Sequence, residues 1–196
     1  MTTPIAFSSP VHQVVFWLAY VGWFVPEIVR GRTLRASAGR DDRGSYGVVV
    51  GGIWVAVALA FASAAIVPAT SFVRDREVWF VTGIVLMIAG VAFRTYAIRT
   101  LGRAFTFEVA TRSDQIVCER GPYRYIRHPA YAGTLVTLLG IGLALGNYGG
   151  ALAAVLVGGA AHAYRIAVEE RVLRRELGEA YVAYASRTRR LIPFVF

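Results

Sequence analysis

Five apolar stretches alternate with polar connections along this chain of 196 residues. Each is near the length of roughly 17–25 residues that a membrane-spanning helix needs. We expect spans over about residues 11–29, 48–69, 78–98, 130–146 and 151–168. The uncharged turn at 147–150 predicts that the last two form a helical hairpin. The pattern predicts an all-α integral membrane protein with five transmembrane helices, built as a single membrane domain over residues 1–196.

Small residues recur within these stretches, as in the run Gly158-Gly159-Ala160-Ala161. They let helices approach closely in lipid, where shape packing replaces the hydrophobic driving force. We interpret Gly140-Ile-Gly142 in the same way, because it lies in the middle of a predicted helix. A nucleotide-binding loop is the less favoured alternative for this motif.

The basic residues are all arginine and lie mainly in three connections, at 30–47, 99–129 and 169–196. The connection between the second and third stretches carries only Arg74 and Arg76, offset by two acidic residues. An excess of positive charge marks the cytoplasmic side of a membrane protein. We therefore expect those three segments and the C-terminus in the cytoplasm, the N-terminus outside, and a location in the bacterial inner membrane.

Composition narrows the classes of function. Hydrophobic residues make up 56% of the chain, above the roughly 45–50% of soluble domains. The net charge of +9 lies beside apolar spans, which is typical of membrane orientation rather than of a nucleic-acid partner. Cys118 is the single cysteine, so no internal disulfide is expected, and residues 1–10 lack the features of a cleavable signal peptide. The expected partners are the lipid bilayer and an apolar or amphiphilic substrate, and the oligomeric state stays open.

The segment after residue 168 is predicted to form an amphipathic helix. One face of it carries Val172, Leu173, Leu177, Tyr181 and Tyr184. The chain then turns back over residues 187–193. This tail either lies on the membrane surface or closes a pocket over the helix ends, and the two interpretations are compatible.

Arg127-His128-Pro129 lies where a polar loop enters the fourth apolar stretch. Proline suits the first turn of a helix, and the free N–H groups there attract anions. The motif is flanked by flat surfaces suited to an adenine ring: Tyr123, Tyr125 and Tyr131. A capped helix start with an arginine reaching the membrane interface is the alternative.

Two adjacent carboxylates, Glu169 and Glu170, follow the fifth stretch. Arg165 lies four residues before Glu169 on the same helix face, so a local ion pair that neutralises both is one interpretation. Glu170 exceeds what one arginine needs, and a ligand with an ammonium or sulfonium group would explain it. Glu108 is interpreted as a second polar anchor for a ligand or as a surface residue. The histidines are scattered, so no metal site is predicted.

Four motifs together resemble the isoprenylcysteine carboxyl methyltransferase family of integral membrane methyltransferases. They are Gly121-Pro-Tyr-Arg-Tyr-Ile-Arg-His-Pro-Ala-Tyr131, Arg165-x-x-x-Glu169-Glu170, Gly178-Glu-Ala-Tyr-x-x-Tyr184 and Arg190-Leu-Ile-Pro193. The resemblance covers about Phe93 to Phe196. It implies methyl transfer from S-adenosylmethionine, which leaves S-adenosylhomocysteine, in a cytoplasmic cofactor pocket formed by the C-terminal half.

The resemblance also implies roles for individual residues. The implied catalytic residues are Arg165, which would position the substrate, and Glu169. The implied cofactor-binding residues are Glu108, Gln115, Ile116, Val117, Cys118, Tyr123, His128, Pro129, Ala130, Tyr131, Glu169 and Glu170. The prenylated proteins that eukaryotic members methylate are not expected as substrates of this arginine-rich, bacterial-type chain.

The residues suit methyl transfer, which needs alignment and desolvation more than acid–base chemistry. A carboxylate acceptor is already ionised near neutral pH, and Arg165 can hold it in register. We therefore expect an S-adenosylmethionine-dependent membrane methyltransferase for a small or lipid-like acceptor, with methyl ester formation on a carboxylate as one form of the reaction. Phospholipid N-methylation or thiol S-methylation is the nearest alternative. A nicotinamide-dependent reductase and a non-enzymatic membrane scaffold are further alternatives.

Overall fold

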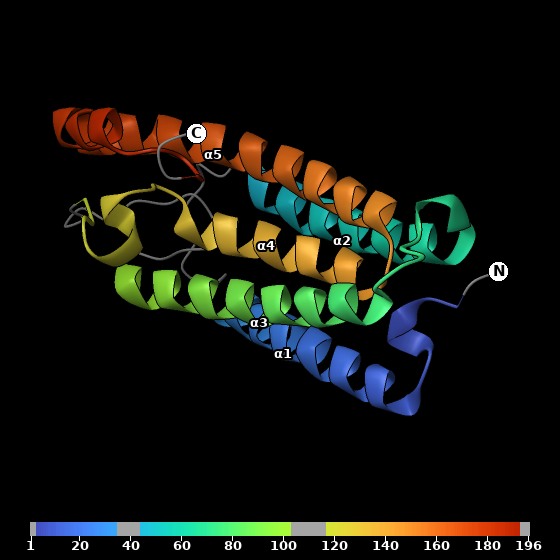
Figure 1. Cartoon of the computed structure of the whole chain (residues 1–196). Coiled ribbons are helices and arrows are strands. Elements are labelled where there is room, and N and C mark those ends of the chain that lie inside the picture. Colours follow the sequence, from blue (N-terminus) through green and yellow to red (C-terminus); the bar gives the residue numbers. More distant parts are fainter. Residues whose placement is uncertain (1–2, 35–43, 103–116, 193–196) are drawn as a thin grey trace.

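The described part of the chain forms five α-helices that lie alongside one another in a bundle (Figure 1). The computed structural model describes residues 3–34, 44–102 and 117–192. The helices are α1 (Pro10–Leu34), α2 (Ser45–Ile66), α3 (Arg76–Leu101), α4 (Pro129–Ala144) and α5 (Tyr148–Arg187). Short 3-10 turns are η1 (Ile5–Phe7), η4 (Pro68–Thr70) and η6 (Gly121–Arg124). The prediction of an all-helical protein is confirmed.

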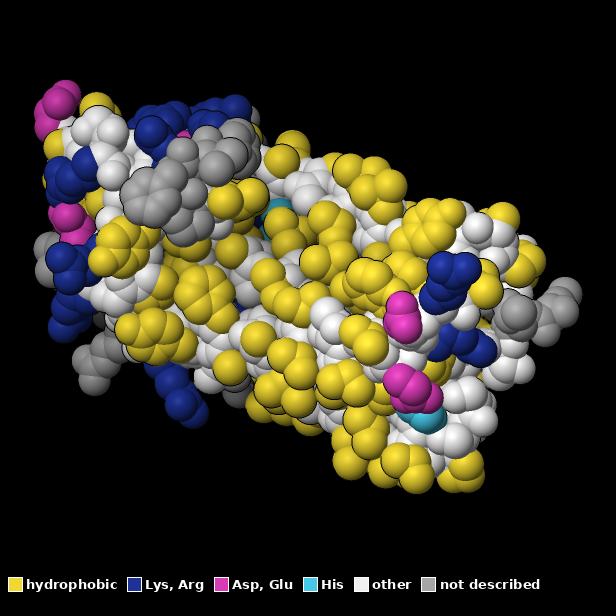
Figure 2. All heavy atoms as spheres, viewed as in Figure 1, with side chains coloured by type: hydrophobic (Ala, Val, Ile, Leu, Met, Phe, Trp, Pro, Cys, Tyr) yellow, Lys and Arg dark blue, Asp and Glu magenta, His cyan; other side chains and the backbone are white. Residues whose placement is uncertain are grey.

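Three of the described helices, α2, α3 and α5, are long and apolar enough to cross a membrane. α4 is apolar but shorter, at 16 residues. The expected number of five spans therefore stays a prediction. Figure 2 shows a broad band of hydrophobic side chains between two charged ends, with most of the visible arginines at the end where α5 finishes.

α4 lies between α3 and α5 and packs backbone to backbone against α3 (Figure 1). A Cβ atom on Gly140 would lie 2.6 Å from the Gly83 carbonyl oxygen, and one on Gly133 would lie 2.8 Å from that of Gly90. Only residues without a side chain allow this approach. The packing interpretation of Gly140 is confirmed, and the contact places the start of α4 beside the end of α3.

A partly buried ion pair between α3 and α1 also holds the start of α4. The Arg94 guanidinium donates from Nε and Nη2 to the two oxygens of Glu27, at 2.8 and 2.7 Å. Its Nη1 donates to the carbonyl oxygen of Ala130 in the first turn of α4, at 3.0 Å. One side chain of α3 thus connects α1 to the N-terminus of α4.

Asn147 lies in the turn that joins the end of α4 to the start of α5. Its side chain is fully buried, and its Oδ1 accepts from the Gly150 backbone N–H at 2.7 Å, which caps α5. The same oxygen accepts from the hydroxyls of Ser63 and Thr70, at 2.9 and 3.0 Å. The predicted hairpin is therefore present, with a turn that α2 and η4 also hold.

α5 extends well beyond the predicted end of the fifth span at residue 168. The helix expected after this point is present as the continuation of α5, which runs to Arg187 with a kink at Gly178. Gly178 has φ 53° and ψ −134°, which glycine adopts far more easily than other residues. Beyond the kink, the Tyr184 hydroxyl donates to the carbonyl oxygen of Tyr123, at 2.8 Å.

Candidate active site

The loop before α4 is held by the segment that follows α5. The backbone N–H groups of Arg127 and His128 donate to the carbonyl oxygens of Arg189 and Arg190, at 2.7 and 3.0 Å. The Arg189 N–H donates in return to the Tyr125 carbonyl oxygen, at 3.0 Å. The tail therefore turns back onto the loop, and these two segments form one wall of the site.

Glu170 is a buried carboxylate at the centre of an ion network at this wall. Its carboxylate accepts from Arg127 Nε at 2.8 Å, from Arg174 at 3.1 Å and from Arg190 at 3.3 Å. These three arginines come from the loop, from α5 and from the tail. One carboxylate with 1% exposure therefore connects three segments of the chain.

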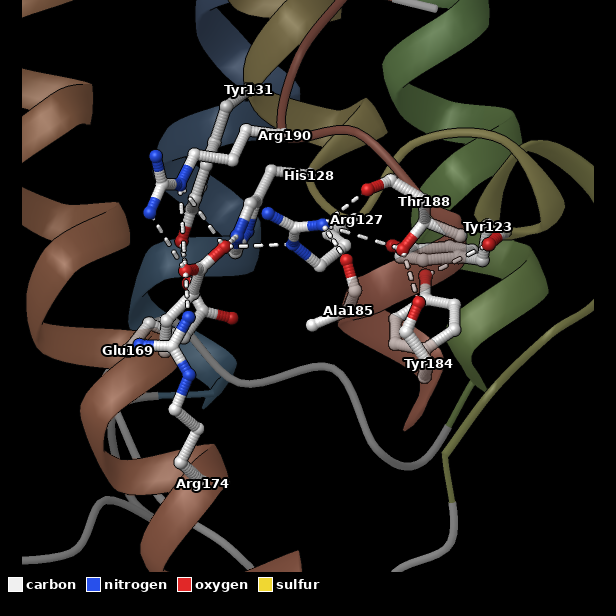
Figure 3. Close-up of polar contacts among 11 residues, drawn as sticks. Tyr123, Arg127, His128, Tyr131, Glu169, Arg174, Tyr184, Ala185, Thr188 and Arg190 are labelled. Carbon is white, nitrogen blue, oxygen red and sulfur yellow. Dashed lines mark hydrogen bonds and ion pairs between the residues drawn. The ribbon is translucent and has the colours of Figure 1, made fainter. Parts of the chain in front are cut away.

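Arg127 extends the network to the end of α5. Its Nη1 donates to the carbonyl oxygen of Ala185 at 3.0 Å and to that of Thr188 (Figure 3). The Thr188 hydroxyl donates in turn to the Tyr184 carbonyl oxygen, at 2.7 Å. The C-terminal carbonyl groups of α5, which have no partner within the helix, thus receive a buried positive charge.

His128 immediately precedes α4 and lies between the two carboxylates. Its Nδ1 is 3.8 Å from Glu169 Oε2, and its Nε2 is 3.4 Å from Glu170 Oε1. The imidazole also stacks on the Tyr131 ring, with centroids 5.5 Å apart and planes 7° apart. Pro129 occupies the first turn, as the sequence predicted for this position.

Tyr131 joins the predicted pair Arg165 and Glu169. Its hydroxyl donates to Glu169 at 2.6 Å and accepts from Arg165 Nε at 3.3 Å. Arg165 is 3% exposed and also donates to the buried hydroxyl of Ser45 at 2.8 Å, at the start of α2. Glu169, by contrast, keeps 28% of its side chain exposed. Arg165 and Glu169 thus lie close together, and the Tyr131 hydroxyl links them.

An apolar cluster adjoins these charges at the end of α3. Tyr123 and Ala130 are buried against Ala97, and Cys118 packs against the same cluster. Burial raises the pKa of the Tyr123 hydroxyl, and the nearby Glu169 carboxylate raises it further. Tyr123 therefore keeps its proton at neutral pH and can donate a hydrogen bond. The site as a whole has an apolar, aromatic side and a charged side.

Comparison with known proteins identifies the family. The family model described as phospholipid methyltransferase matches residues 78–180, which is more than half of the chain. The chain belongs to the phospholipid methyltransferase family. The match runs from α3 through the loop and α4 into the part of α5 beyond the kink.

Relatives within this family carry more specific names. Protein-S-isoprenylcysteine O-methyltransferase B of Arabidopsis thaliana is 35% identical over 125 residues, which cover 61% of this chain and 63% of that protein. Protein-S-isoprenylcysteine O-methyltransferase of Schizosaccharomyces pombe is 32% identical over 108 residues, which cover 54% of this chain and 46% of that protein. The match therefore spans less than two thirds of either relative. The resemblance to isoprenylcysteine carboxyl methyltransferases is confirmed.

A solved structure shares the fold of the chain. It is the eukaryotic intramembrane Ras methyltransferase named isoprenylcysteine carboxyl methyltransferase, with a TM-score of 0.64 and 24% sequence identity. The similarity covers 97% of this chain and 70% of the other. All five described helices of this family member thus belong to a known membrane-protein fold.

Most of the predicted site residues of this methyltransferase-family chain lie together. The loop, α4 and α5 bring the following side chains into one region: Cys118, Tyr123, His128, Pro129, Ala130, Tyr131, Arg165, Glu169 and Glu170. Val117 is half-buried beside Cys118. Glu108, Gln115 and Ile116 lie outside the described residues.

One interpretation from the sequence needs correction. Glu170 is not a surplus charge that requires a ligand, since Arg127, Arg174 and Arg190 already surround it. Tyr125 differs from the buried Tyr123, because it is 56% exposed with the Arg124 guanidinium 6.0 Å from its ring. The structural role of Arg190 was missed, although its motif was part of the resemblance.

Proposed function

We propose that this protein is a membrane methyltransferase that uses S-adenosylmethionine to methylate a carboxylate of a lipid-like acceptor, giving a methyl ester. Membership of the phospholipid methyltransferase family and relatives named O-methyltransferases support this reaction class. The observation that carries the proposal is the linkage of a buried guanidinium to a partly exposed carboxylate through Tyr131. Charges at this depth of an apolar protein are costly, so they point to a function.

The charged side of the site fits the donor. Glu169 has 28% of its side chain exposed and one short hydrogen bond, from Tyr131, so its carboxylate can still receive a positive group. S-adenosylmethionine carries an ammonium and a sulfonium, and when bound it would supply an electrophilic methyl group. We assign Glu169, His128 and Tyr131 to holding it, and Tyr123 and Ala130 to its apolar surroundings. Glu170 would support His128 from the other side.

The acceptor side needs orientation rather than proton removal. A carboxylate is ionised at neutral pH, so no general base has to act on it. The Arg165 guanidinium is nearly free of water, and its positive charge would attract the acceptor carboxylate toward the pocket. Exclusion of water by the surrounding helices would strengthen that attraction and keep the reacting groups aligned.

The same site could serve a second reaction, because the family model that matches is described as phospholipid methyltransferase. A phospholipid amine would have to lose a proton before methylation, and His128 between two carboxylates is the available base. Esters and methylated amines are chemically distinguishable, since only the ester releases methanol in alkali. The alkali stability of the methylated product therefore identifies the class of acceptor.

We further infer a bacterial inner-membrane protein with five spans and the site on the cytoplasmic side. The visible arginines gather at the end of the bundle where α5 finishes and where the site lies (Figure 2). Positive charge favours the cytoplasmic face. α1 and the short α4 would be the two spans beyond the three that length and composition support.

The test is calorimetric binding of S-adenosylhomocysteine to the detergent-purified protein, followed by methyl transfer from labelled S-adenosylmethionine. We expect the wild type to bind, and Glu169→Gln to lose at least about tenfold in affinity, as for a hydrogen bond to a charged group. Glu176→Gln is the matched control, since Glu176 lies exposed on the same helix and contacts the adjacent Arg175. It should bind as the wild type does.

The acceptor is tested with a prenylated cysteine and with phosphatidylethanolamine in separate vesicles. Label that alkali releases as methanol supports ester formation, whereas alkali-stable label on the phospholipid supports the second reaction. Binding of NADPH in place of S-adenosylhomocysteine, or of neither compound, would overturn the proposed function.

A further inference from the structure

Tyr181 has a buried hydroxyl without a hydrogen-bond partner among the described residues. The residue is 3% exposed and lies just beyond the kink at Gly178 in α5. Buried hydroxyl groups in proteins nearly always have a partner, because an unpaired one loses its bonds to water without replacement. The groups that surround the Tyr181 hydroxyl therefore indicate what kind of partner it has.

The neighbouring Tyr184 provides a comparison on the same helix. The two rings pack with centroids 5.9 Å apart, and both residues are 3% exposed. The Tyr184 hydroxyl donates to the Tyr123 carbonyl oxygen at 2.8 Å. These two phenols are equally buried, but within the described parts of the chain only the Tyr184 hydroxyl has a protein partner.

Tyr181 lies close to the candidate site. Its ring packs against Tyr184, whose hydroxyl donates to the carbonyl oxygen of Tyr123 on the apolar side of the site. Burial raises the pKa of the Tyr181 hydroxyl, and the Glu170 and Glu169 carboxylates raise it further. Glu170 and Arg127 are already bound to each other at 2.8 Å, whereas Glu169 is the partly exposed carboxylate of the site. The hydroxyl therefore borders the same region as the residues proposed to hold the donor.

We propose that the Tyr181 hydroxyl forms a hydrogen bond with a polar group of the bound adenosyl cofactor. This inference rests on the proposed function, and it adds a cofactor-binding residue from the C-terminal part of α5. The C-terminal part of α5 then closes the site with a direct contact, while the segment after α5 holds the loop before α4. An ordered water is the alternative partner, and it would not depend on the cofactor.

The test compares Tyr181→Phe with Tyr184→Phe in two measurements, thermal unfolding without ligand and calorimetric binding of S-adenosylhomocysteine. Each change removes one oxygen from a buried phenol. Tyr181→Phe should unfold at the same temperature as the wild type or slightly higher, because it removes an unpaired polar atom. It should bind S-adenosylhomocysteine about five- to tenfold more weakly, as expected for one lost hydrogen bond.

Tyr184→Phe should give the opposite result in unfolding. It leaves the Tyr123 carbonyl oxygen without its donor, so the melting temperature should fall by about 2–4 °C. Opposite effects of the same chemical change on neighbouring residues would separate a ligand contact from a structural one.

The outcomes distinguish the inference from the proposed function. If the wild type binds S-adenosylhomocysteine and Tyr181→Phe binds it equally well, the hydroxyl contacts water and only this inference is overturned. A fall in melting temperature for Tyr181→Phe equal to that of Tyr184→Phe would likewise overturn it, since the hydroxyl would then have a structural partner. If the wild type does not bind, the proposed function fails and the inference fails with it.

Discussion

Replacing Glu170 by glutamine should destabilise the protein far more than the same change at Glu169. The Glu170 and Arg127 side chains are 2% and 9% exposed, so their ion pair lies almost entirely out of water. Removing one partner of such a pair typically costs about 3–5 kcal/mol, because the other charge is left buried and uncompensated. The contacts around Glu170 and Arg127 narrow the expected loss in the free energy of unfolding.

Two features place the loss at the low end, at about 3 kcal/mol. Glutamine retains an oxygen that can accept from Arg127, and Arg127 retains the carbonyl oxygens of Ala185 and Thr188. The other two arginines add little. Arg174 and Arg190 are 49% and 39% exposed, so water screens their charges and each contributes less than about 1 kcal/mol.

The assay is thermal unfolding in detergent, followed by tryptophan fluorescence. In a protein of this size, 1 kcal/mol corresponds to about 2–4 °C, so Glu170→Gln should lower the melting temperature by about 6–12 °C. Glu169→Gln should lower it by less than about 4 °C, because that side chain is 28% exposed and keeps an acceptor for Tyr131. Equal shifts for the two variants would refute the assignment of Glu170 to structure, as would a shift below about 2 °C for Glu170→Gln.

Two further changes test the packing that positions the site. Gly90→Ala should cost about 1–3 kcal/mol in unfolding, because its Cβ would lie 2.4 Å from Thr137 Oγ1 and 2.6 Å from the Gly133 carbonyl oxygen. Gly159→Ala, with nothing within 4 Å of the new atom, is the control that should show no loss. Asn147→Ala should cost about 2 kcal/mol or more, since it removes the cap of α5 together with buried hydrogen bonds. Thermal unfolding measures all three variants, and an unchanged melting temperature for Asn147→Ala would contradict its role in the turn.

The helices were predictable because membrane helices follow from local composition. The expected spans at 48–69 and 78–98 correspond to α2 at Ser45–Ile66 and α3 at Arg76–Leu101. Whether the amphipathic helix expected after residue 168 is continuous with the fifth span was not predictable in this way. Hydropathy drops after residue 168 whether a helix ends or continues out of the apolar region, and α5 continues, with a kink at Gly178.

Of the three arginine partners of Glu170, sequence spacing predicts only the local one. The contact with Arg174 is an i,i+4 pair and can be inferred from spacing. Arg127 and Arg190 are 43 and 20 positions away, and they reach Glu170 only because the tail folds back onto the loop. The sequence alone does not show that contact, so Glu170 was interpreted as a surplus carboxylate whose partner is a ligand.

The adjacent carboxylates therefore have different roles because of helix geometry. Successive residues on a helix point about 100° apart, so Glu170 turns into the tail while Glu169 turns toward Tyr131 and stays partly exposed. His128 lies between them, 3.8 Å from Glu169 and 3.4 Å from Glu170, and so couples the network to the site. Loss of either carboxylate should then reduce activity, and a catalytic assay alone would assign both to the reaction. Unfolding and cofactor binding measured on the same variants separate the residue that holds the site together from the residue that holds the ligand.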